Sequence, residues 1–345
     1  MTLVTELDTL RFAAPGSQNA RWRRLFNWAS FHELNLGGAG RPSGSGLSEQ
    51  DVFFTEVHDD AGRMLGGLSG VRDGDTFISG YSAPFGGFDF VDDRETNDNI
   101  ADVVLGSVSN IQAAGVRSMR LKLAPTCYSD NEPVVQFTLL NAGFTVERCE
   151  LNQHIPVASW RTPLEYVHNL RPAAQKTLRY LLTEELTFGE VTDDAVWAQA
   201  YNLLAENRLR KGRRFALSAE YLARARTQLS PHVRMFALRH GHGEGSQLVA
   251  AALVYRVAPG RDLVVAWGDS EHELKRSPMM LLAYRLVERA IADGVGVIDL
   301  GISNEPELRL HEGGSGLVPN SGLVQFKRSV LAKIEPRFTL IKDLR

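Results

Sequence analysis

The pattern of apolar and polar positions is most regular between residues 262 and 327. Asp262–Asp269 and Gly296–Gly301 are short apolar runs bounded by turn residues, which is typical of buried strands. Between them, Lys275–Asp293 carries apolar residues at helical spacing and is followed by a glycine, which predicts one long helix. The polar residues of this strand–helix–strand unit fall at the strand ends, where an open α/β sheet usually places a ligand site.

A similar unit occurs in the first half of the chain. Asp75–Tyr81 predicts a strand, Asn99–Ala114 a helix and Arg117–Leu123 a second strand. Each unit follows a meander of predicted strands, which lie at Asp51–His58, Met64–Arg72, Val233–Arg239 and Gln247–Val257. The offset between the two units, roughly 180 residues, is far longer than the period of a solenoid or propeller repeat, so it indicates a duplicated domain.

The remaining predicted elements complete two halves of similar order. Helices are expected at Arg21–Leu34, Pro133–Asn141, Arg171–Leu186, Ala195–Arg210 and Ser218–Leu229, and strands at Val146–Ile155 and Arg337–Ile341. We therefore predict a mixed α/β (α+β) fold with an N-terminal domain over residues 1–158 and a C-terminal domain over residues 159–345. The region Trp160–Arg171 is expected to connect them.

Composition narrows the class of protein. The 345 residues are 43% hydrophobic and 23% charged, which suits a globular protein, and the net charge of −3 argues against a generally basic nucleic-acid binder. Two distant cysteines, and histidines without metal-binding spacing, predict neither a disulfide framework nor a metal cofactor. We find no signal peptide and no run near the ~20 apolar residues of a membrane span, so we expect a cytoplasmic monomer or homodimer.

Four short segments carry a family resemblance. Ile298–Ser303 (Ile-Asp-Leu-Gly-Ile-Ser) is similar to a strand that ends in Asp-Phe-Gly-x-Ser, and Asn320–Lys327 to an Asn-x-Gly-Leu-x-x-Phe-Lys segment. Glu206–Gly212 resembles a helix end of the same family, and Ala83–Phe88 its Pro-x-Gly-Gly-Phe loop. With the order of elements, the chain resembles tandem GNAT-fold acyltransferases, in particular the Fem-type peptidyltransferases and their BioF2-like relatives.

The resemblance implies a catalytic second domain and a degenerate first domain on the acceptor side. It also implies direct transfer of an acyl or aminoacyl group to an amine, without a covalent enzyme intermediate. The chain departs from the pattern at two places. Single-domain acetyltransferases hold the coenzyme A pyrophosphate on a glycine-rich loop before the central helix, and Glu273–Pro278 lacks those glycines. After the Phe-Lys pair, Val330-Leu331-Ala332 stands where the family continues to Phe-Gly.

Candidate donor-binding residues lie at and after the end of the strand Asp262–Asp269. Lys275 and Arg276 come just before a helix N-terminus, where they could hold a phosphate or remain solvated loop charges. Trp267 and Asp269 end the strand, and the indole could stack on a base or pack in the core. Phe326 could stack on the acyl donor.

Candidate catalytic residues are Asp299, Ser303 and Lys327. A carboxylate inside an apolar strand needs a partner or a raised pKa, so Asp299 is either a general base for the attacking amine or a group that bonds neighbouring backbone. Ser303 follows in the loop and could contact the acceptor. In the family, the pair that matches Phe326-Lys327 is linked to the tRNA end and the reacting carbonyl, which implies Lys327 as an oxyanion stabiliser. A surface lysine is the alternative.

Candidate substrate-binding residues are polar or cationic side chains at predicted helix and loop positions, together with residues that the resemblance points to. They are Phe85, Gly86, Arg171, Lys176, Asn207, Arg208, Lys211, Glu305 and Asn320. The four cations could bind a phosphorylated or tRNA substrate, or form solvated basic faces.

The expected function is N-acyl transfer to an amine of a small molecule or a cell-envelope precursor. Acyl-CoA is the first choice of donor, because the net charge is mild and no coiled-coil arm for tRNA is present. Aminoacyl-tRNA is the alternative donor, favoured by the missing glycines and by Phe326-Lys327. A further alternative is a non-catalytic GNAT-fold binding module.

Overall fold

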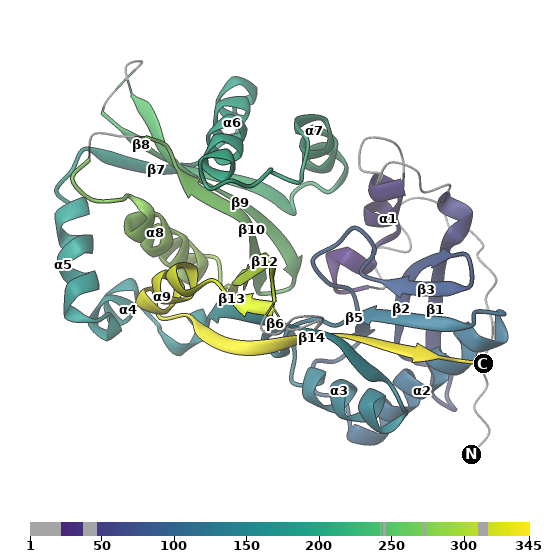
Figure 1. The fold of residues 1–345 in the computed structure, drawn as a ribbon. Coiled ribbons are helices and arrows are strands. Elements are labelled where there is room, and N and C mark those ends of the chain that lie inside the picture. Colours follow the sequence, from purple (N-terminus) through teal and green to yellow (C-terminus); the bar gives the residue numbers. More distant parts are fainter. Residues whose placement is uncertain (1–21, 37–46, 242, 244–245, 272–273, 310–316) are drawn as a thin grey trace. The chain divides into compact units, whose positions relative to one another are not determined.

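The structure is a computed structural model that describes residues 22–36, 47–241, 243, 246–271, 274–309 and 317–345. It divides into two compact units (Figure 1). Unit 1 comprises Met1–Asn152, Asn304–Pro319 and Glu335–Arg345, and unit 2 comprises Gln153–Ser303 and Asn320–Ile334. The boundary between two duplicated halves at residues 158 and 159 stays a prediction.

Unit 1 is built on a mixed sheet. Its helices are α1 Ala29–Leu36, α2 Asn97–Ala113 and α3 Glu132–Asn141, with short 3-10 turns at Leu25–Asn27 (η2), Glu49–Asp51 and Thr126–Tyr128. Its strands are β1 Val52–His58, β2 Met64–Asp73, β3 Thr76–Ser79, β4 Phe88–Phe90, β5 Ser118–Lys122, most of β6 Thr145–Ile155, β12 Asn304–Arg309, β13 Leu317–Pro319 and most of β14 Lys333–Asp343.

The sheet of unit 1 has the order β1-β2-β3-β5-β14-β6. Strands β1, β2 and β3 form an antiparallel meander, α2 follows, and β5 then pairs in parallel with β3. Helices α2 and α3 bury their apolar sides against one face of the sheet, in a core that includes Leu68, Phe77 and Leu121. Helix α1 contributes to a smaller cluster with Val52 and Val71 of β1 and β2.

Unit 2 repeats this plan of a strand meander, a helix and a parallel strand. Its helices are α4 Pro163–Asn169, α5 Pro172–Leu181, α6 Asp194–Arg210, α7 Ala219–Gln228, α8 Met279–Ala292 and α9 Ser321–Ser329, and a 3-10 turn lies at Val157–Ser159. Its strands are β7 Leu186–Glu190, β8 Val233–His240, β9 Gln247–Ala258, β10 Arg261–Asp269 and β11 Val297–Ile302. Strands β7 to β10 form an antiparallel meander, and β11 pairs in parallel with β10 after α8.

The helices of unit 2 lie on both faces of its sheet (Figure 1). Helices α4, α5 and α8 share one core with alternate residues of β9, namely Ala250, Ala252 and Val254. Helix α6 contacts β9 and β10 but contributes nothing to that core, because it packs on the opposite face. In the described residues no helix is long and apolar enough to cross a membrane.

The predicted mixed α/β fold is confirmed, and both halves have the GNAT order of a meander, a helix and a parallel strand. Several predicted elements were wrong in detail. The expected helix at Arg21–Leu34 is a 3-10 turn followed by α1, and the one at Arg171–Leu186 ends at Leu181, before an edge strand, β7. The expected connection Trp160–Arg171 contains α4, and Ser321–Ser329 is a helix that the sequence analysis did not predict.

Candidate functional site

Strands β10 and β11 of unit 2 pair only at their beginnings. The parallel ladder joins Arg261, Asp262 and Leu263 to the residues 297–299 and then stops. Strand β10 continues to Asp269, paired with β9 alone, and its register against β9 shifts between Val264 and Ala266. Strand β11 continues to Ile302. The two strands therefore separate toward their carboxyl ends, and no other strand in the described chain pairs with this edge of β10.

The corresponding strands of unit 1 stay together. All four residues of β3 pair with β5 in parallel, as far as Ser79 with Leu121. The loop after β3 is bound to the same strands, because the Gly86 amide donates to the Lys122 carbonyl at 2.8 Å. The Nζ of Lys122 in turn donates to the carbonyls of Gly80 and Ala83, at 3.1 and 2.8 Å. This half has no opening comparable to that of unit 2 in its described residues.

The two first-half residues expected at a substrate site lie inside this closed region. Phe85 is fully buried and packs against the rings of Phe26 and Tyr128, with centroids 5.0 and 4.6 Å away. A Cβ on Gly86 would lie 2.4 Å from the amide nitrogen of Gly80, so the glycine permits close backbone packing. In this structure both residues pack the loop against its surroundings, and their predicted substrate contacts stay predictions.

Helix α9 connects the two diverging strands of unit 2. The ring of Phe326 meets that of Trp267 on β10 edge to face, with centroids 5.5 Å apart. The next residue, Lys327, is 1% exposed, and its Nζ donates to the carbonyls of Gly301 and Ile302 on β11, at 2.8 and 3.1 Å. Neighbouring residues of one helix therefore bind the ends of both strands.

The end of β11 is a bonded turn. Asp299 is 1% exposed, and its Oδ1 accepts a hydrogen bond from the Gly301 amide at 2.8 Å. Gly301 has a φ of +69°, a conformation that other residues adopt only with strain. Asp299 thus binds an amide of this turn, and Lys327 binds two of its carbonyls. Their predicted catalytic roles stay predictions, and the geometry gives each of them a structural task.

Ser303 belongs to a second buried connection. Its hydroxyl donates to Oε1 of Gln153 at 2.7 Å, and the Gln153 amide donates to the Val324 carbonyl at 3.3 Å. Both side chains are fully buried. Asn320 caps α9, since its Oδ1 accepts from the Leu323 amide at 2.9 Å, and its predicted substrate contact stays a prediction. Gln153 was missed in the sequence because nothing local marks a glutamine on a strand 150 residues before its partner.

The end of β10 is held by α6. Asn207 is 2% exposed, and its amide donates to the main-chain carbonyl and to Oδ1 of Asp269, at 2.8 and 3.0 Å. Lys211 donates to the Asn207 Oδ1 at 3.0 Å, and Arg210 donates to the Asp269 carbonyl. The other carboxylate oxygen of Asp269 accepts from the Ser277 hydroxyl at 2.8 Å. The side-chain amide of Asn207 is already bonded to Asp269, so Asn207 positions the end of β10.

Of the remaining predicted cations, Arg208 on α6 is half-buried and the others are exposed. Lys275 and Arg276 lie in the loop between β10 and α8, three and two residues before the α8 N-cap, Pro278. Arg171 is the N-cap residue of α5 and Lys176 lies on that helix. Glu305 lies on β12, which belongs to unit 1. The structure brings Trp267, Phe326, Lys327 and Asp299 together around the two strand ends. It does not bring Phe85 or Gly86 into that unit.

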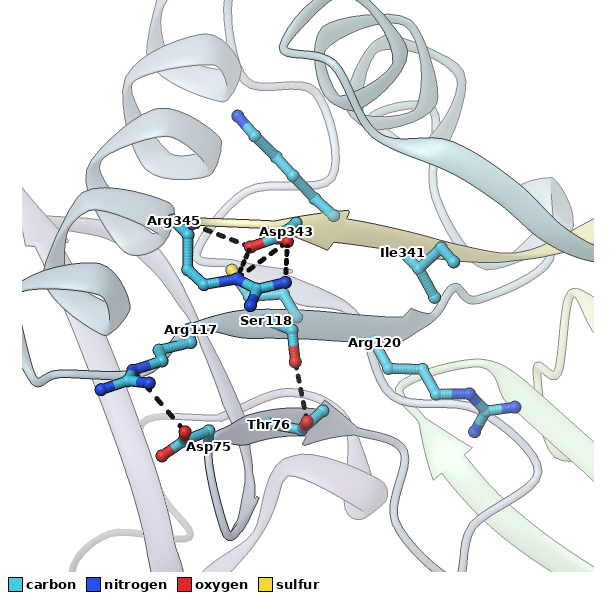
Figure 2. Close-up of a pocket in the computed structure, with 10 residues that line it drawn as sticks. Asp75, Thr76, Arg117, Ser118, Arg120, Ile341, Asp343 and Arg345 are labelled. Atoms are coloured by element: carbon cyan, nitrogen blue, oxygen red, sulfur yellow. Dashed lines mark hydrogen bonds and ion pairs between the residues drawn. The ribbon is translucent and has the colours of Figure 1, made fainter.

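Unit 1 has a pocket of about 400 Å³ on β3, β5 and β14 (Figure 2). Two ion pairs lie within its lining: Arg117 is 3.6 Å from Asp75, and Arg345 is bound to Asp343 at 2.6 Å. The hydroxyls of Thr76 and Ser118 bond each other at 2.7 Å. None of the predicted site residues lines this pocket.

The separated strand ends of unit 2 carry groups that can bind a carbonyl oxygen and a phosphate. The edge of β10 that faces away from β9 carries main-chain N–H groups without a strand partner, and such groups can bind a carbonyl oxygen and the oxyanion that forms from it. The N-terminus of α8 is next along the chain, and Ser277 just before it bonds Asp269 at the end of β10. There the helix dipole and free N–H groups favour a phosphate.

Comparison with known proteins agrees with this chemistry. Residues 168–309 match a family model described as "Acetyltransferase (GNAT) domain". Among solved structures, FemX superposes with a TM-score of 0.67 at 9% identity, over 97% of either chain. A conserved protein of unknown function from Bacteroides thetaiotaomicron gives a TM-score of 0.50 at 12% identity, over 99% of this chain and 100% of that one. A search of curated proteins gives no match.

The comparisons identify one domain of the chain and the fold of the whole. Residues 168–309 are a GNAT domain, and the whole chain has the fold of FemX. A tandem GNAT protein from the clavulanic acid biosynthesis pathway is also similar, with a TM-score of 0.45 and 12% identity over 91% of this chain and 94% of that one.

Proposed function

We propose that the chain transfers an acyl group from acyl-CoA to an amine of a small molecule or a cell-envelope precursor. The observation that carries the proposal is the separation of β10 from β11 in unit 2, beside the α8 N-terminus. An acyl thioester carbonyl placed against the exposed edge of β10 would receive main-chain hydrogen bonds, while the diphosphate would meet the loop with Lys275 and Arg276.

The reaction needs no covalent enzyme intermediate. The amine nitrogen attacks the thioester carbonyl, a C–N bond forms, the C–S bond breaks, and the nitrogen loses a proton as the thiolate of coenzyme A leaves. Holding the two reactants in line supplies much of the rate. Lys327 and Asp299 bond the end of β11, and Asn207 bonds the end of β10, which makes the three of them positioning residues in this proposal.

Thermal-shift and turnover measurements test the donor. We expect acetyl-CoA or a longer acyl-CoA to raise the melting temperature, and free coenzyme A thiol to appear when an amine is added. The double variant Lys275→Ala, Arg276→Ala should weaken acyl-CoA binding about tenfold or more, the effect of losing charge-assisted hydrogen bonds. The matched control is Arg328→Ala, Lys333→Ala, which removes two exposed cations elsewhere in unit 2. Equal binding by both double variants would count against the phosphate site.

A second candidate donor is aminoacyl-tRNA. It is supported by the FemX fold over nearly the full chain and by the absence of glycines in 273–278. Amide formation with charged tRNA, and none with any acyl-CoA, would favour this donor. No binding of either donor would favour a non-catalytic binding module.

A further inference from the structure

The pocket of unit 1 lies on the face of its sheet opposite to α2 and α3 (Figure 2). Phe77, Met119 and Leu340 of β3, β5 and β14 are buried in the core that those helices cover. Because successive side chains of a strand point to opposite faces, the residues next to them point the other way. Such residues line the pocket, namely Thr76, Ser118, Arg120, Ile341 and Asp343. The pocket volume of about 400 Å³ is enough for a small-molecule ligand.

The strand register places these side chains in two rows. Thr76 pairs with Ser118 and Ser118 with Asp343, so the first row is polar. Its two hydroxyls bond each other at 2.7 Å. In the second row Arg120 pairs with Ile341, which is 37% exposed. Side chains of paired residues lie next to each other, so the guanidinium stem of Arg120 has an apolar neighbour on the pocket side.

The charges around the pocket balance. Three arginines lie beside three carboxylates, at 3.6, 2.7 and 2.6 Å, namely Arg117 beside Asp75, Arg120 beside Glu147 and Arg345 beside Asp343. Lys342 also borders the pocket, but its Nζ donates to the Ala142 carbonyl at 2.6 Å, on the side of α3. A ligand with a net charge therefore gains little here, whereas a ligand with one charge of each sign can match both.

Two of these charged groups keep unused hydrogen-bonding positions. Arg120 donates to Glu147 through Nε, and within the described residues its two Nη groups have no hydrogen-bond partner. The Asp75 carboxylate lies 3.6 Å from the Nε of Arg117, beyond hydrogen-bond distance, and it accepts no hydrogen bond from the part of the chain that the structure describes. The pocket thus offers a free anionic acceptor and a free cationic donor.

The free acceptor and the free donor lie apart along the strands. Asp75 precedes Thr76, which pairs with Ser118, and Arg120 is two residues further on. In Figure 2 the bond between the Thr76 and Ser118 hydroxyls lies between Asp75 and Arg120. The separation is three residues along the strand direction, or about 10 Å, of which the two side chains span a part. An α-amino acid, with both charges on one carbon, is too short to reach both groups.

We propose that this pocket binds a short ω-amino carboxylic acid, with its ammonium at Asp75, its carboxylate on the Nη groups of Arg120 and its carbon chain against Ile341. The hydroxyl pair of Thr76 and Ser118 borders the middle of the ligand. All of these residues belong to unit 1. The site is therefore separate from the strand ends of unit 2 to which acyl transfer is assigned, and it does not depend on that assignment.

Binding is tested with probes of equal chain length by isothermal titration calorimetry of the full chain at constant ionic strength and neutral pH. We expect 5-aminopentanoate to bind about tenfold or more tightly than pentanoate, which lacks the ammonium, and than pentylamine, which lacks the carboxylate. This is the factor for one charge-assisted hydrogen bond. Norvaline, which carries both charges on one carbon, should also bind more weakly. No binding of any probe, or equal binding of 5-aminopentanoate and pentanoate, would overturn the proposal.

Variants test which residue binds which end of the ligand. Arg120→Gln should abolish the preference for 5-aminopentanoate over pentylamine, and Asp75→Asn should abolish the preference over pentanoate. Each variant should keep the preference that depends on the other residue. The controls Arg161→Gln and Asp60→Asn remove exposed charges outside the pocket and should keep both preferences. Both preferences surviving in Arg120→Gln and in Asp75→Asn would refute the site, provided that circular dichroism shows the variants to be folded.

Other ligand classes give different results. Norvaline that binds more tightly than 5-aminopentanoate would make this a site for α-amino acids, against our proposal. Inorganic phosphate that binds as tightly as 5-aminopentanoate, with the response lost in Arg120→Gln, would make it a plain anion site and would also overturn the proposal.

Discussion

Lys327 offers the sharpest test, because its family-based role and its position in this structure predict different results. Its ammonium is 1% exposed and donates to two main-chain carbonyls, those of Gly301 and Ile302. In Lys327→Met the side chain keeps a similar length and loses every donor. Each carbonyl left unsatisfied in a dry site costs about 1–3 kcal/mol, and methionine recovers a part of this by burying its apolar stem. We expect the free energy of unfolding to fall by about 2–4 kcal/mol.

Urea unfolding followed by circular dichroism measures this fall, and acyl transfer is measured on the same samples. The control is Lys333→Met, six residues along the chain, whose exposed side chain should change stability by less than about 0.5 kcal/mol. A positioning role predicts that Lys327→Met loses stability and activity together, and that Lys327→Arg retains part of both. Full stability with abolished turnover would refute the structural role and support direct action of the ammonium on the oxyanion.

Three further predictions concern other parts of the chain. Leu331 has a φ of +63° just after α9, so Leu331→Gly should be more stable than Leu331→Ala by about 1 kcal/mol in urea unfolding; the reverse order would show that the turn is unstrained. Burial lowers the pKa of His32 from 6.5 to about 4, and between those pH values only the unfolded chain takes up the proton. Stability should therefore fall by about 3 kcal/mol more in the wild type than in His32→Gln from pH 7 to pH 4, and parallel curves would contradict this. A Cβ on Gly268 would lie 2.6 Å from the Asn207 amide, so Gly268→Ala should destabilise by about 1–3 kcal/mol. Part of that cost should vanish in an Asn207→Ala background, and additive effects would refute the clash.

The periodicity of apolar residues predicted the strands β10 and β11 and the helix α8 of unit 2 correctly. The apolar runs of β10 and β11 and the long stripe of α8 are local signals, and the glycine after α8 marks its end. Helix α9 was missed although Asn320 is a good N-cap, because its nine residues carry few apolar side chains and the asparagine was interpreted as a loop residue. Strand β7 was missed because it is a short edge strand with mostly exposed residues.

The candidate site was predictable as a set of residues but not as an arrangement. The motifs pointed to Asp299, Lys327 and Asn207, and all three lie at the ends of β10 or β11. Asp299 bonds the nearby Gly301, but the partners of Lys327 and Asn207 lie 25 or more residues away in the chain, so no spacing rule reveals them. The separation of β10 from β11 could not be predicted from the sequence either. The pattern of apolar residues in a strand is the same whether its edge is paired or unpaired.

The place of β14 in unit 1 has a consequence for synthesis of the chain on the ribosome. In sheet order β14 lies between β5 and β6, and its residues Thr339–Asp343 pair with Lys122–Ser118. A nascent chain that has emerged only as far as unit 2 therefore has a gap in the middle of its first sheet, with strand edges open to wrong partners. N-terminal domains commonly fold first during translation. Here the sheet of unit 1 is complete only after β14 has been synthesised. Chaperone dependence and sensitivity to translation arrest should be greatest in the interval after unit 2 is made and before β14 emerges.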